Sequence, residues 1–499
     1  MIDNLALGLG AAATPINIGV ALIGCLLGTM IGVLPGIGAV ATLAMLMPIT
    51  YGLDPLTGLI MLAAIYYGAQ YGGSTTAILV NMPGESSSVV TCLDGYHMAQ
   101  KGRAGAALTV AALGSLFAGV VGTLVIAGFG PMLAKASQSF QSPEYFALMV
   151  FGLIGSIVLA SGSLLKAVGM IFLGLLFGLV GTDATSGTMR YAFGQANLFE
   201  GIDFVVMALG LFGLPEILRN LEGNADSERS RIATVGSLFP SRAEWRRAIP
   251  AALRGTGLGA VLGILPGGGS VLASFASYAV EKQVSGQPQS FGTGRIEGVA
   301  GPESANNAAA QTAFIPMLSL GIPSHPVMAL MMGAMMVHGI SPGSGLIDKQ
   351  PVLFWGMVAS MLIGNLMLVI INLPMIGIWV KLLRVPYRLL FPAIAIFCCI
   401  GIYSVRGEAF DLWLAAGVTV LGYLFHRLNC EPAPFLLAFV LGPMMEENLR
   451  RSMLLSRGSV SIFLDRPICL ALLLLSVLLL MVAVLPRVRK RREETFAED

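Results

Sequence analysis

Two stretches of this sequence carry hydroxyl and amide side chains within otherwise apolar segments. Their members are Ser74, Thr75 and Asn81 in the first stretch and Asn306, Asn307, Ser324 and His325 in the second. Burying a bare hydroxyl or amide costs on the order of a few kcal/mol, so each of these groups needs a hydrogen-bonding partner. A polar ligand in a water-lined cavity would supply such partners.

The chemistry available to these stretches is neutral hydrogen bonding. Neither Lys nor Arg occurs in residues 29–50, 68–94, 259–280 or 300–340. An anionic ligand would therefore be held by backbone amides and hydroxyls, and a cation would supply the compensating charge. The alternative is that these Ser, Thr and Asn side chains only join helices, as they often do in membranes. That alternative is open for any single residue, whereas the recurrence in both stretches favours a binding site.

A glycine ladder precedes each polar stretch and must help to position it. Glycine recurs every fourth residue from Gly24 to Gly36 and again from Gly255 to Gly267, at an offset of 231 residues. Between 24–40 and 255–271, nine of seventeen residues are identical. The sequence therefore predicts an ancestral duplication, with two structural repeats in one chain.

Each ladder ends in a break that a regular helix cannot continue. The breaks read Leu34-Pro35-Gly36-Ile37-Gly38 and Leu265-Pro266-Gly267-Gly268-Gly269. Glycine every fourth residue makes a flat face for close helix packing in lipid. The Pro-Gly segment frees backbone groups, which a membrane tolerates only inside protein or beside a watery cavity. Broken helices at matching positions of two halves indicate the binding site of a transporter.

A second pair of turns follows, at Asn81-Met-Pro83-Gly84 and Gly321-Ile-Pro323-Ser324, related by an offset of 240 residues. We expect both turns to leave helix N-termini facing the site. The predicted substrate-binding residues are Gly36, Gly38, Ser74, Thr75, Asn81, Pro83, Gly84, Gly267, Gly268, Gly269, Asn306, Asn307, Gly321, Pro323, Ser324 and His325.

A coupling ion, either Na⁺ or H⁺, is predicted beside the substrate, and no other cofactor is expected. Its predicted residues are Gly36, Asn81, Glu303 and Asn306. Carbonyl groups of the unwound breaks are suitable ligands for Na⁺. An intramembrane acid such as Glu303 is functional by default, although it could also be an exposed acid at a helix start near Pro302.

The composition excludes several classes of protein. Of 499 residues, 56% are hydrophobic and only 11% are charged, with a mean hydropathy of +0.81. Soluble proteins carry about 25% charged residues, so this is a polytopic membrane protein in contact with lipid. The four histidines lack metal-ligand spacing and no P-loop motif occurs, so we expect neither a histidine metal site nor ATP binding through a P-loop. We expect no enzyme, because the repeated segments lack basic residues, a histidine pair and convergent acids. The net charge of +2 gives no indication of nucleic-acid binding.

We predict an all-α polytopic fold with roughly 10–14 spans, broken helices and re-entrant hairpins. The two repeats are expected to have inverted topology, because the loops at 96–105 and 338–351 differ in basic charge. The re-entrant segments are expected at 36–50, 74–100, 267–281 and 302–340. The expected division is a first membrane repeat at 1–218, a cytoplasmic basic linker at 219–251, a second membrane repeat at 252–466, and a final span with a basic tail at 467–499.

The sidedness of the C-terminal region stays open. Both 447–466 and 487–492 are basic, and a single span between them puts one of them outside. Either 433–466 is re-entrant or one basic cluster lies on the outer side of the membrane.

Several motifs together resemble the large membrane subunit of the tripartite tricarboxylate transporters. They are Gly32-x-Leu-Pro-Gly-x-Gly38, Tyr71-Gly-Gly-Ser74, Asn81-Met-Pro-Gly-Glu85, Gly301-Pro-Glu-Ser-Ala-Asn-Asn307, Leu320-Gly-Ile-Pro323, and Leu441-Gly-Pro443 with Glu446 and Leu449-Arg-Arg-Ser452. The resemblance implies a bacterial inner-membrane secondary transporter that imports carboxylates such as citrate or related organic acids. It also implies a small membrane subunit, a periplasmic substrate-binding protein and a cation gradient as the energy source.

Three other readings of the sequence are weighed against this one. A membrane enzyme acting on lipid-linked substrates needs convergent acids, basic residues or a metal set, which the repeated segments lack. A passive channel usually gains symmetry from oligomerisation rather than from duplicated broken helices. A non-transporting scaffold would tolerate loss of the Asn81 and Asn306 side chains.

Overall fold

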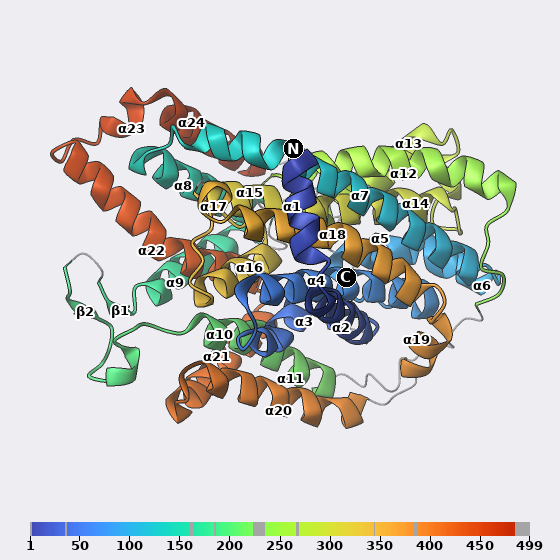
Figure 1. Cartoon of the computed structure of the whole chain (residues 1–499), viewed down its shortest axis with the longest axis horizontal. Helices are drawn as coiled ribbons and strands as arrows, with labels where there is room; N and C mark the ends of the chain where they lie inside the picture. The colour runs from blue at the N-terminus through green and yellow to red at the C-terminus, as the bar shows by residue number, and fades with distance from the viewer. Residues whose placement is uncertain are drawn as a thin grey trace.

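The computed structural model of the chain describes residues 2–34, 37–159, 163–183, 186–222, 235–265, 269–343, 345–383 and 387–484. Within these ranges the chain is almost entirely helical, and its regular strands form one short antiparallel hairpin (Figure 1). The all-α class predicted from the sequence is confirmed.

Short 3₁₀ and π segments, labelled η, interrupt or join the helices. The elements up to residue 222 are α1 (Ile2–Ala12), α2 (Pro15–Gly32), α3 (Ala39–Leu46), η1 (Met47–Thr50), α4 (Pro55–Val80), η2 (Ser86–Ser88), α5 (Val89–Thr91), η3 (Cys92–Tyr96), α6 (His97–Gln100), α7 (Ala104–Ser137), α8 (Ser142–Leu159), α9 (Leu164–Gly178), β1 (Gly181–Thr182), β2 (Met189–Arg190), η4 (Ala196–Leu198), α10 (Phe204–Ala208), η5 (Leu209–Gly213) and α11 (Leu214–Glu222). The later elements are α12 (Arg242–Leu262), α13 (Gly269–Val284), η6 (Pro288–Ser290), α14 (Glu297–Thr312), α15 (Phe314–Leu320), α16 (Pro326–Val337), α17 (Leu346–Lys349), α18 (Pro351–Asn372), α19 (Ile376–Leu382), α20 (Tyr387–Arg406), α21 (Ala409–Arg427), α22 (Pro432–Leu455), α23 (Ile462–Asp465) and α24 (Pro467–Val484).

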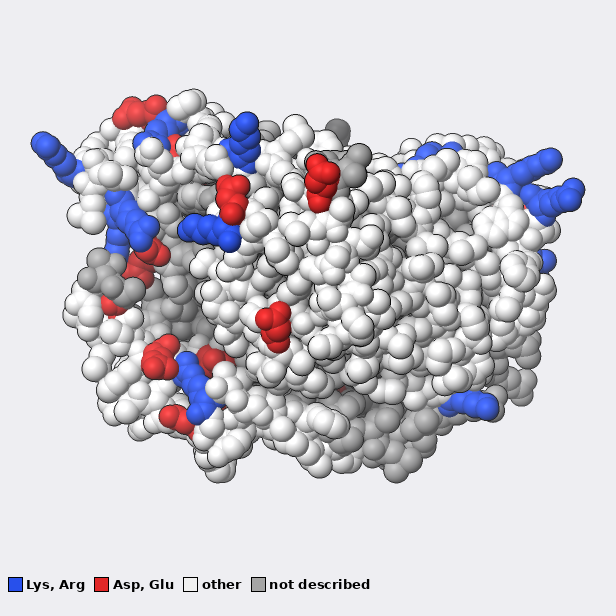
Figure 2. Space-filling view, viewed as in Figure 1, with Lys and Arg blue, Asp and Glu red and all other residues white. Residues whose placement is uncertain are grey.

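The helices and the surface both fit a membrane. By length and composition, α2, α7, α18 and α21 are long and apolar enough to cross a bilayer, and several shorter apolar helices accompany them. On the face seen in Figure 2, charged side chains gather towards the two ends of the long axis and leave a broad, mostly uncharged middle. The chain is therefore a multi-pass membrane protein, while the number of its crossings stays a prediction.

Both glycine ladders pack as flat faces. A Cβ added at Gly24 would lie 2.7 Å from the carbonyl oxygen of Met61 on α4, and Gly28 and Gly32 meet the α4 backbone in the same way. On α12, Gly255 and the next two ladder glycines lie against the backbone of α14. Each ladder thus sets one helix directly on the helix that carries a polar stretch.

The two proline turns share one backbone conformation. Asn81 ends α4 in the left-handed region at φ 58°, and Gly321 ends α15 there at φ 72°. Four residues later, Glu85 and His325 are both extended, at φ −149° and −159°, and a helical segment begins after each. Asn81 and Gly321 therefore both end a helix, and Glu85 and His325, also 240 residues apart, both precede the next helical segment.

Elements of one half pack on elements of the other at the centre of the molecule. The segment after the first break, α3, contacts α16, and the segment after the second break, α13, contacts η2 and α5. The central helices α4 and α14 are joined by a hydrogen bond from the Tyr67 hydroxyl to Oε1 of Gln311, at 2.9 Å. This crossed packing supports a duplicated fold, whose symmetry and inverted topology stay predictions.

Three boundaries differ from the sequence-based expectation. The predicted re-entrant segment at 74–100 begins inside α4, because hydroxyls at 74–76 bond back to carbonyls four residues earlier and fit a continuous helix. The helix α12 begins at Arg242, inside the predicted linker, where Ser241 and Glu244 form a capping box. Finally, α22 is unbroken from Pro432 to Leu455, so no re-entrant turn interrupts this stretch.

Candidate functional site

The glycines that follow the two breaks lie at the proline turns. Gly36, Gly267 and Gly268 lie outside the described residues, but the glycines that follow each break are described. A Cβ added at Gly38 would lie 3.9 Å from the carbonyl oxygen of Gly84. A Cβ added at Gly269 would lie 3.4 Å from Cδ2 of His325. We call the region around Gly38, Gly84, Gly269 and His325 the junction.

At the second turn, the junction contains polar atoms without partners. Ser324 is 1% exposed, and its hydroxyl has no hydrogen-bond partner within the described part of the chain. His325 precedes the first residue of α16, and its Nε2 likewise has no described partner. The ring of Tyr66, from the middle of α4, lies 6.2 Å from the His325 ring. Two buried polar groups without described partners and one aromatic ring therefore lie near one another at the second turn.

The helix α4 adds a buried amide to this space. Both amide atoms of Gln70 are buried, and neither has a hydrogen-bond partner among the residues that the structure describes. Gln70 lies one turn after Tyr66, and the Tyr66 hydroxyl lies close to Gln70 and to Ser270 of α13. Leaving a buried polar group unpaired costs about 1–3 kcal/mol, so these groups favour a hydrogen-bonding partner such as water or a polar ligand.

At the first turn, α14 contacts the junction through Asn306. Nδ2 of Asn306 lies 3.5 Å from Oε1 of Glu85, which also accepts a hydrogen bond of 2.5 Å from the Ser87 hydroxyl. Asn306 and Asn307 are each 1% exposed, and Oδ1 of each lacks a partner in the described ranges. The structure therefore brings Asn306 and Glu85 together, from opposite halves of the chain.

One turn before Asn306, Glu303 forms a second polar cluster between the halves. Its Oε2 lies 2.6 Å from the Ser74 hydroxyl of α4, and its Oε1 accepts a hydrogen bond from Thr91 of α5. Glu303 is 1% exposed, so it is not the exposed helix-start acid of the alternative interpretation. A buried carboxyl of this kind is a candidate for a proton or cation site in a membrane protein.

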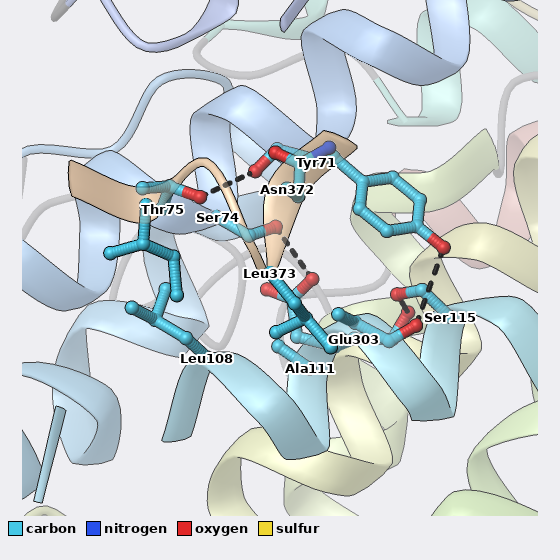
Figure 3. A pocket seen from close by; sticks show the side chains of 11 residues that line it. Tyr71, Ser74, Thr75, Leu108, Ala111, Ser115, Glu303, Asn372 and Leu373 are labelled. Atoms are coloured by element: carbon cyan, nitrogen blue, oxygen red, sulfur yellow. Dashed lines mark hydrogen bonds between the residues drawn. The ribbon is translucent and has the colours of Figure 1, made fainter. Parts of the chain in front are cut away.

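A small pocket borders this cluster, and Figure 3 shows Ser74 and Glu303 pointing toward one another within it. The walls come from α4, α7, α14 and the interruption between α18 and α19. The pocket is lined by Tyr71, Ser74, Thr75, Leu108, Ala111, Ala112, Ser115, Glu303, Asn372, Leu373 and Ile376. Of the predicted site residues, Ser74, Thr75 and Glu303 therefore line one cavity.

Other predicted residues lie apart from these clusters. Asn81 and Pro83 are exposed, and Asn81 serves as the left-handed C-cap of α4, a position that Asn tolerates well. Gly321 takes the corresponding cap position, where a Cβ would lie 2.8 Å from the carbonyl oxygen of Pro342. Pro323 is buried beside the unpartnered Ser324. The predicted binding roles of Asn81, Pro83 and Gly321 stay predictions.

Comparison with known proteins identifies the family of this site. The family model described as "Tripartite tricarboxylate transporter TctA family" matches residues 18–437. The chain belongs to the tripartite tricarboxylate transporter TctA family. It is a component of a transporter and not an enzyme.

Two relatives of this TctA-family chain come from Agrobacterium vitis. One, named "Uncharacterized 52.8 kDa protein in TAR-I ttuC' 3'region", is 57% identical over 499 residues, which is 100% of this chain and 99% of the relative. The other, named "Uncharacterized protein in TAR-II ttuC' 3'region", is 59% identical over 241 residues, which is 48% of this chain and 100% of the relative. No solved structure is significantly similar to the chain.

Sequence reasoning missed several side chains of this TctA-family site. Tyr66 and Gln70 lie in the apolar run of α4 and look like ordinary core residues of a membrane helix. Thr91, which bonds Glu303, lies beyond the first proline turn and carries no motif. Helical spacing was the available signal, because Tyr66, Gln70 and Ser74 recur every fourth residue and share one face of α4.

Proposed function

We propose that this chain is the large membrane subunit of an importer of carboxylates, such as tricarboxylates, dicarboxylates or related organic acids, working by cation-coupled alternating access. The observation that carries the proposal is the junction, where buried polar atoms of both halves lack partners. These atoms are Nε2 and Oε1 of Gln70, Oδ1 of Asn306, Oγ of Ser324 and Nε2 of His325.

The chemistry of the junction suits a carboxylate. The Ser324 hydroxyl, the Gln70 amide and a suitably protonated His325 ring donate to carboxylate oxygens without carrying a fixed charge. Since no Lys or Arg occurs in 68–94, 259–280 or 300–340, the ligand's negative charge needs a balancing ion. A cotransported Na⁺ or H⁺ supplies it, which makes transport cation-coupled.

The crossed packing of the halves supports the proposal of alternating access. The elements α3 and α13 follow the two breaks, and each contacts the other half beside a proline turn. A rigid-body movement of one half would open the junction to one side and then to the other. If the repeats are inverted, the outward-open and inward-open states would be related by exchange of the conformations of the two repeats.

The partners and the location complete the proposal. The family description is tripartite, which supports a small membrane subunit and a periplasmic substrate-binding protein acting with this chain in a bacterial inner membrane. Specificity would then be shared between the binding protein and the junction, with Ser324 and His325 the junction residues nearest the substrate.

The test is substrate uptake after identification of the acid. Thermal shift of the partner binding protein against an organic-acid panel selects the ligand, and cells expressing all three components are assayed for its uptake. Asn306→Ala is expected to reduce uptake about tenfold or more, corresponding to the loss of one buried hydrogen bond. The matched variant Asn448→Ala, on α22, removes an amide that bonds only its own helix and is expected to transport normally. Uptake in Asn306→Ala equal to that of the wild type, or no uptake of any acid by the wild type, would contradict the proposal.

A further inference from the structure

The Glu303 carboxyl occupies an unusual position between the halves. It belongs to α14, whereas its two hydroxyl partners, Ser74 and Thr91, belong to the first half of the chain. No Lys, Arg or His in the described ranges forms an ion pair with it, although it is 1% exposed. An ionised carboxylate in such surroundings is costly unless a cation neutralises it.

The hydrogen atoms available at Ser74 favour a protonated acid. The Ser74 hydroxyl oxygen lies 2.6 Å from Oε2 of Glu303 and 3.1 Å from the carbonyl oxygen of Gln70. A hydroxyl carries one hydrogen, so it can donate to only one of these two acceptors. If the acid is protonated, its O–H donates to Ser74, and Ser74 donates to the Gln70 carbonyl. Both close contacts are then hydrogen bonds.

The same group accommodates the ionised acid by rotation of one hydroxyl. When the proton leaves, the Ser74 hydroxyl turns to donate to Oε2, and Thr91 continues to donate to Oε1. The pocket lined by Tyr71, Ser115 and Asn372 gives water a place beside the carboxyl (Figure 3). Glu303 can therefore exchange a proton with pocket water without a large rearrangement of its neighbours.

We propose that Glu303 is the proton-binding group of the transport cycle, with Ser74 as its rotating partner. This inference rests on the proposed function and specifies its coupling ion as H⁺. A hydronium ion in the pocket gives its proton to the carboxylate and leaves as water, which forms the neutral acid. The acid later returns the proton to water on the other side, when α4 and α14 move apart.

Other titratable groups around Glu303 are already engaged or lie at a distance. The groups close enough to interact electrostatically with Glu303 are Tyr71 of α4, Glu85 before η2 and Cys92 of η3. Two further acids lie against α14 at other positions: Asp94 of η3 at Gly298 and Glu281 of α13 at Gly301. Glu281 pairs with Arg254 of α12 at 2.6 Å. The only ionisable side chain within α7 is Lys135, about 30 Å along the helix from Ser115.

The test uses the complete tripartite system in proteoliposomes and the variant Glu303→Gln. Glutamine resembles the neutral acid in shape but does not ionise, so it cannot bind and release the transported proton. Accumulation driven by an inward proton gradient is expected to fall about tenfold or more, while exchange of labelled for unlabelled substrate stays within about twofold of the wild type. The surface variant Glu447→Gln, on α22, is the control and is expected to retain both activities.

The outcomes separate this inference from the proposed function. Gradient-driven accumulation by Glu303→Gln equal to that of the wild type overturns the inference, and so does loss of exchange in the folded variant. Wild-type accumulation that follows Na⁺ and ignores the proton gradient also overturns it, while leaving carboxylate import intact. A wild type without accumulation or exchange of any acid contradicts the proposed function itself.

A second variant keeps the inference testable if Glu303→Gln fails to fold. Ser74→Ala removes the acceptor of the neutral acid's O–H and also the donor to the ionised carboxylate. The bond to the ionised carboxylate is charge-assisted and therefore the stronger of the two, so the ionised form loses more free energy than the neutral acid. The pH midpoint of uptake is expected to move upwards by about one unit. An unchanged midpoint would contradict the role of Ser74.

Discussion

Gln70, Asn306 and His325 share a property that packing alone does not explain: each buries polar atoms with no partner in the described ranges. A core selected only for stability would place apolar side chains at such positions, because unpaired polar groups lower the free energy of unfolding. Retaining them is reasonable if a ligand completes their hydrogen bonds during transport.

Gln70→Leu separates these two accounts. The apolar replacement removes an unsatisfied amide from the core, so the Tm in detergent is expected to stay level or rise. Uptake is expected to fall about tenfold or more because the substrate loses a donor. Differential scanning fluorimetry and uptake assays measure the two effects. Gln283→Leu, at an exposed position on α13, is the control. A lower Tm with normal uptake would assign Gln70 a structural role.

At the scale of single residues, the sequence predicted candidate site residues best where a polar side chain lies in an apolar segment. Ser74, Asn306 and His325 stood out because polar side chains are rare in apolar segments, and the structure buries all three. Tyr66 did not stand out, because an aromatic residue in a membrane helix is ordinary. Asn81 also contrasted with its apolar surroundings, but the structure gives a different reason for an Asn there. It caps α4 in the left-handed conformation, which Asn adopts more readily than most residues. Helix packing decides which polar residues come together in space. The local sequence around a single residue does not specify that packing.

At the scale of elements, the ladders decide how closely helices approach. The backbone of α12 rests on α14 through Gly255, Gly259 and the ladder position after them, as α2 rests on α4. The ladder period was sufficient to predict this packing, because only glycine leaves the helix surface flat at every fourth position.

Gly259→Ala tests the ladder against a control on the same helix. The new Cβ would clash with the Ala305 backbone, so the free energy of unfolding is expected to fall by about 1–3 kcal/mol. Gly257→Ala is the control, because nothing lies within 4 Å of its Cβ position. It is expected to be neutral or to stabilise by about 0.4–1 kcal/mol. Equal effects of the two changes on thermal stability would contradict the packing described.

The π segment η3 holds the second half through Asp94. Its Oδ1 accepts hydrogen bonds from the backbone N–H groups of Gly292, Gly294 and Arg295, at 2.7–3.0 Å, and Oδ2 accepts one from the Tyr278 hydroxyl. Asp94→Ala would leave these donors without their acceptor. Hydrogen–deuterium exchange at 290–296 is expected to accelerate about tenfold or more. Unchanged exchange there would show that the loop is held by other contacts.

At the scale of the whole molecule, the two basic segments lie at opposite ends of the long axis. The start of α12 and the connection between α22 and α24 are separated in this way in Figure 1. At the α22 end the arginines are largely paired with acids: Arg450 with Glu446 at 2.6 Å, and Arg466 with Glu144 at 3.0 Å. Arginines at the α12 end are paired as well, Arg254 with Glu281 at 2.6 Å, so pairing does not distinguish the two ends. The end that carries α12 is the expected cytoplasmic side because the first turns of α12 belong to the predicted basic linker at 219–251.

Cysteine labelling tests this orientation. In a background without native cysteines, Thr188→Cys places a thiol on the exposed β1–β2 hairpin, which Arg190 joins to Glu446 of α22. Gln289→Cys places one in η6, near the α12 end. A membrane-impermeant maleimide is expected to label position 188 in intact spheroplasts and position 289 only after permeabilisation. The reverse pattern would invert the assignment of sides.

The sequence predicted the fold class of the whole molecule, but it did not predict where every helix begins and ends. Apolar runs predicted the all-α membrane fold. The interruption that separates α18 from α19 contains Pro374, which cannot continue a regular helix. The start of α12 was misplaced because its arginine-rich first turns resemble a linker, although Ser241-Arg-Ala-Glu244 is a readable capping box. The β1–β2 hairpin was missed because its paired residues are few and polar contacts with α22 hold it.

The central claim is that the junction binds a carboxylate together with a cation and moves both across the membrane. It is tested most directly by accumulation of the identified acid in proteoliposomes containing this chain and its two partner components. We predict accumulation against the substrate gradient, which disappears when the proton and sodium gradients are both collapsed. Accumulation that persists unchanged after both gradients are collapsed would contradict the account.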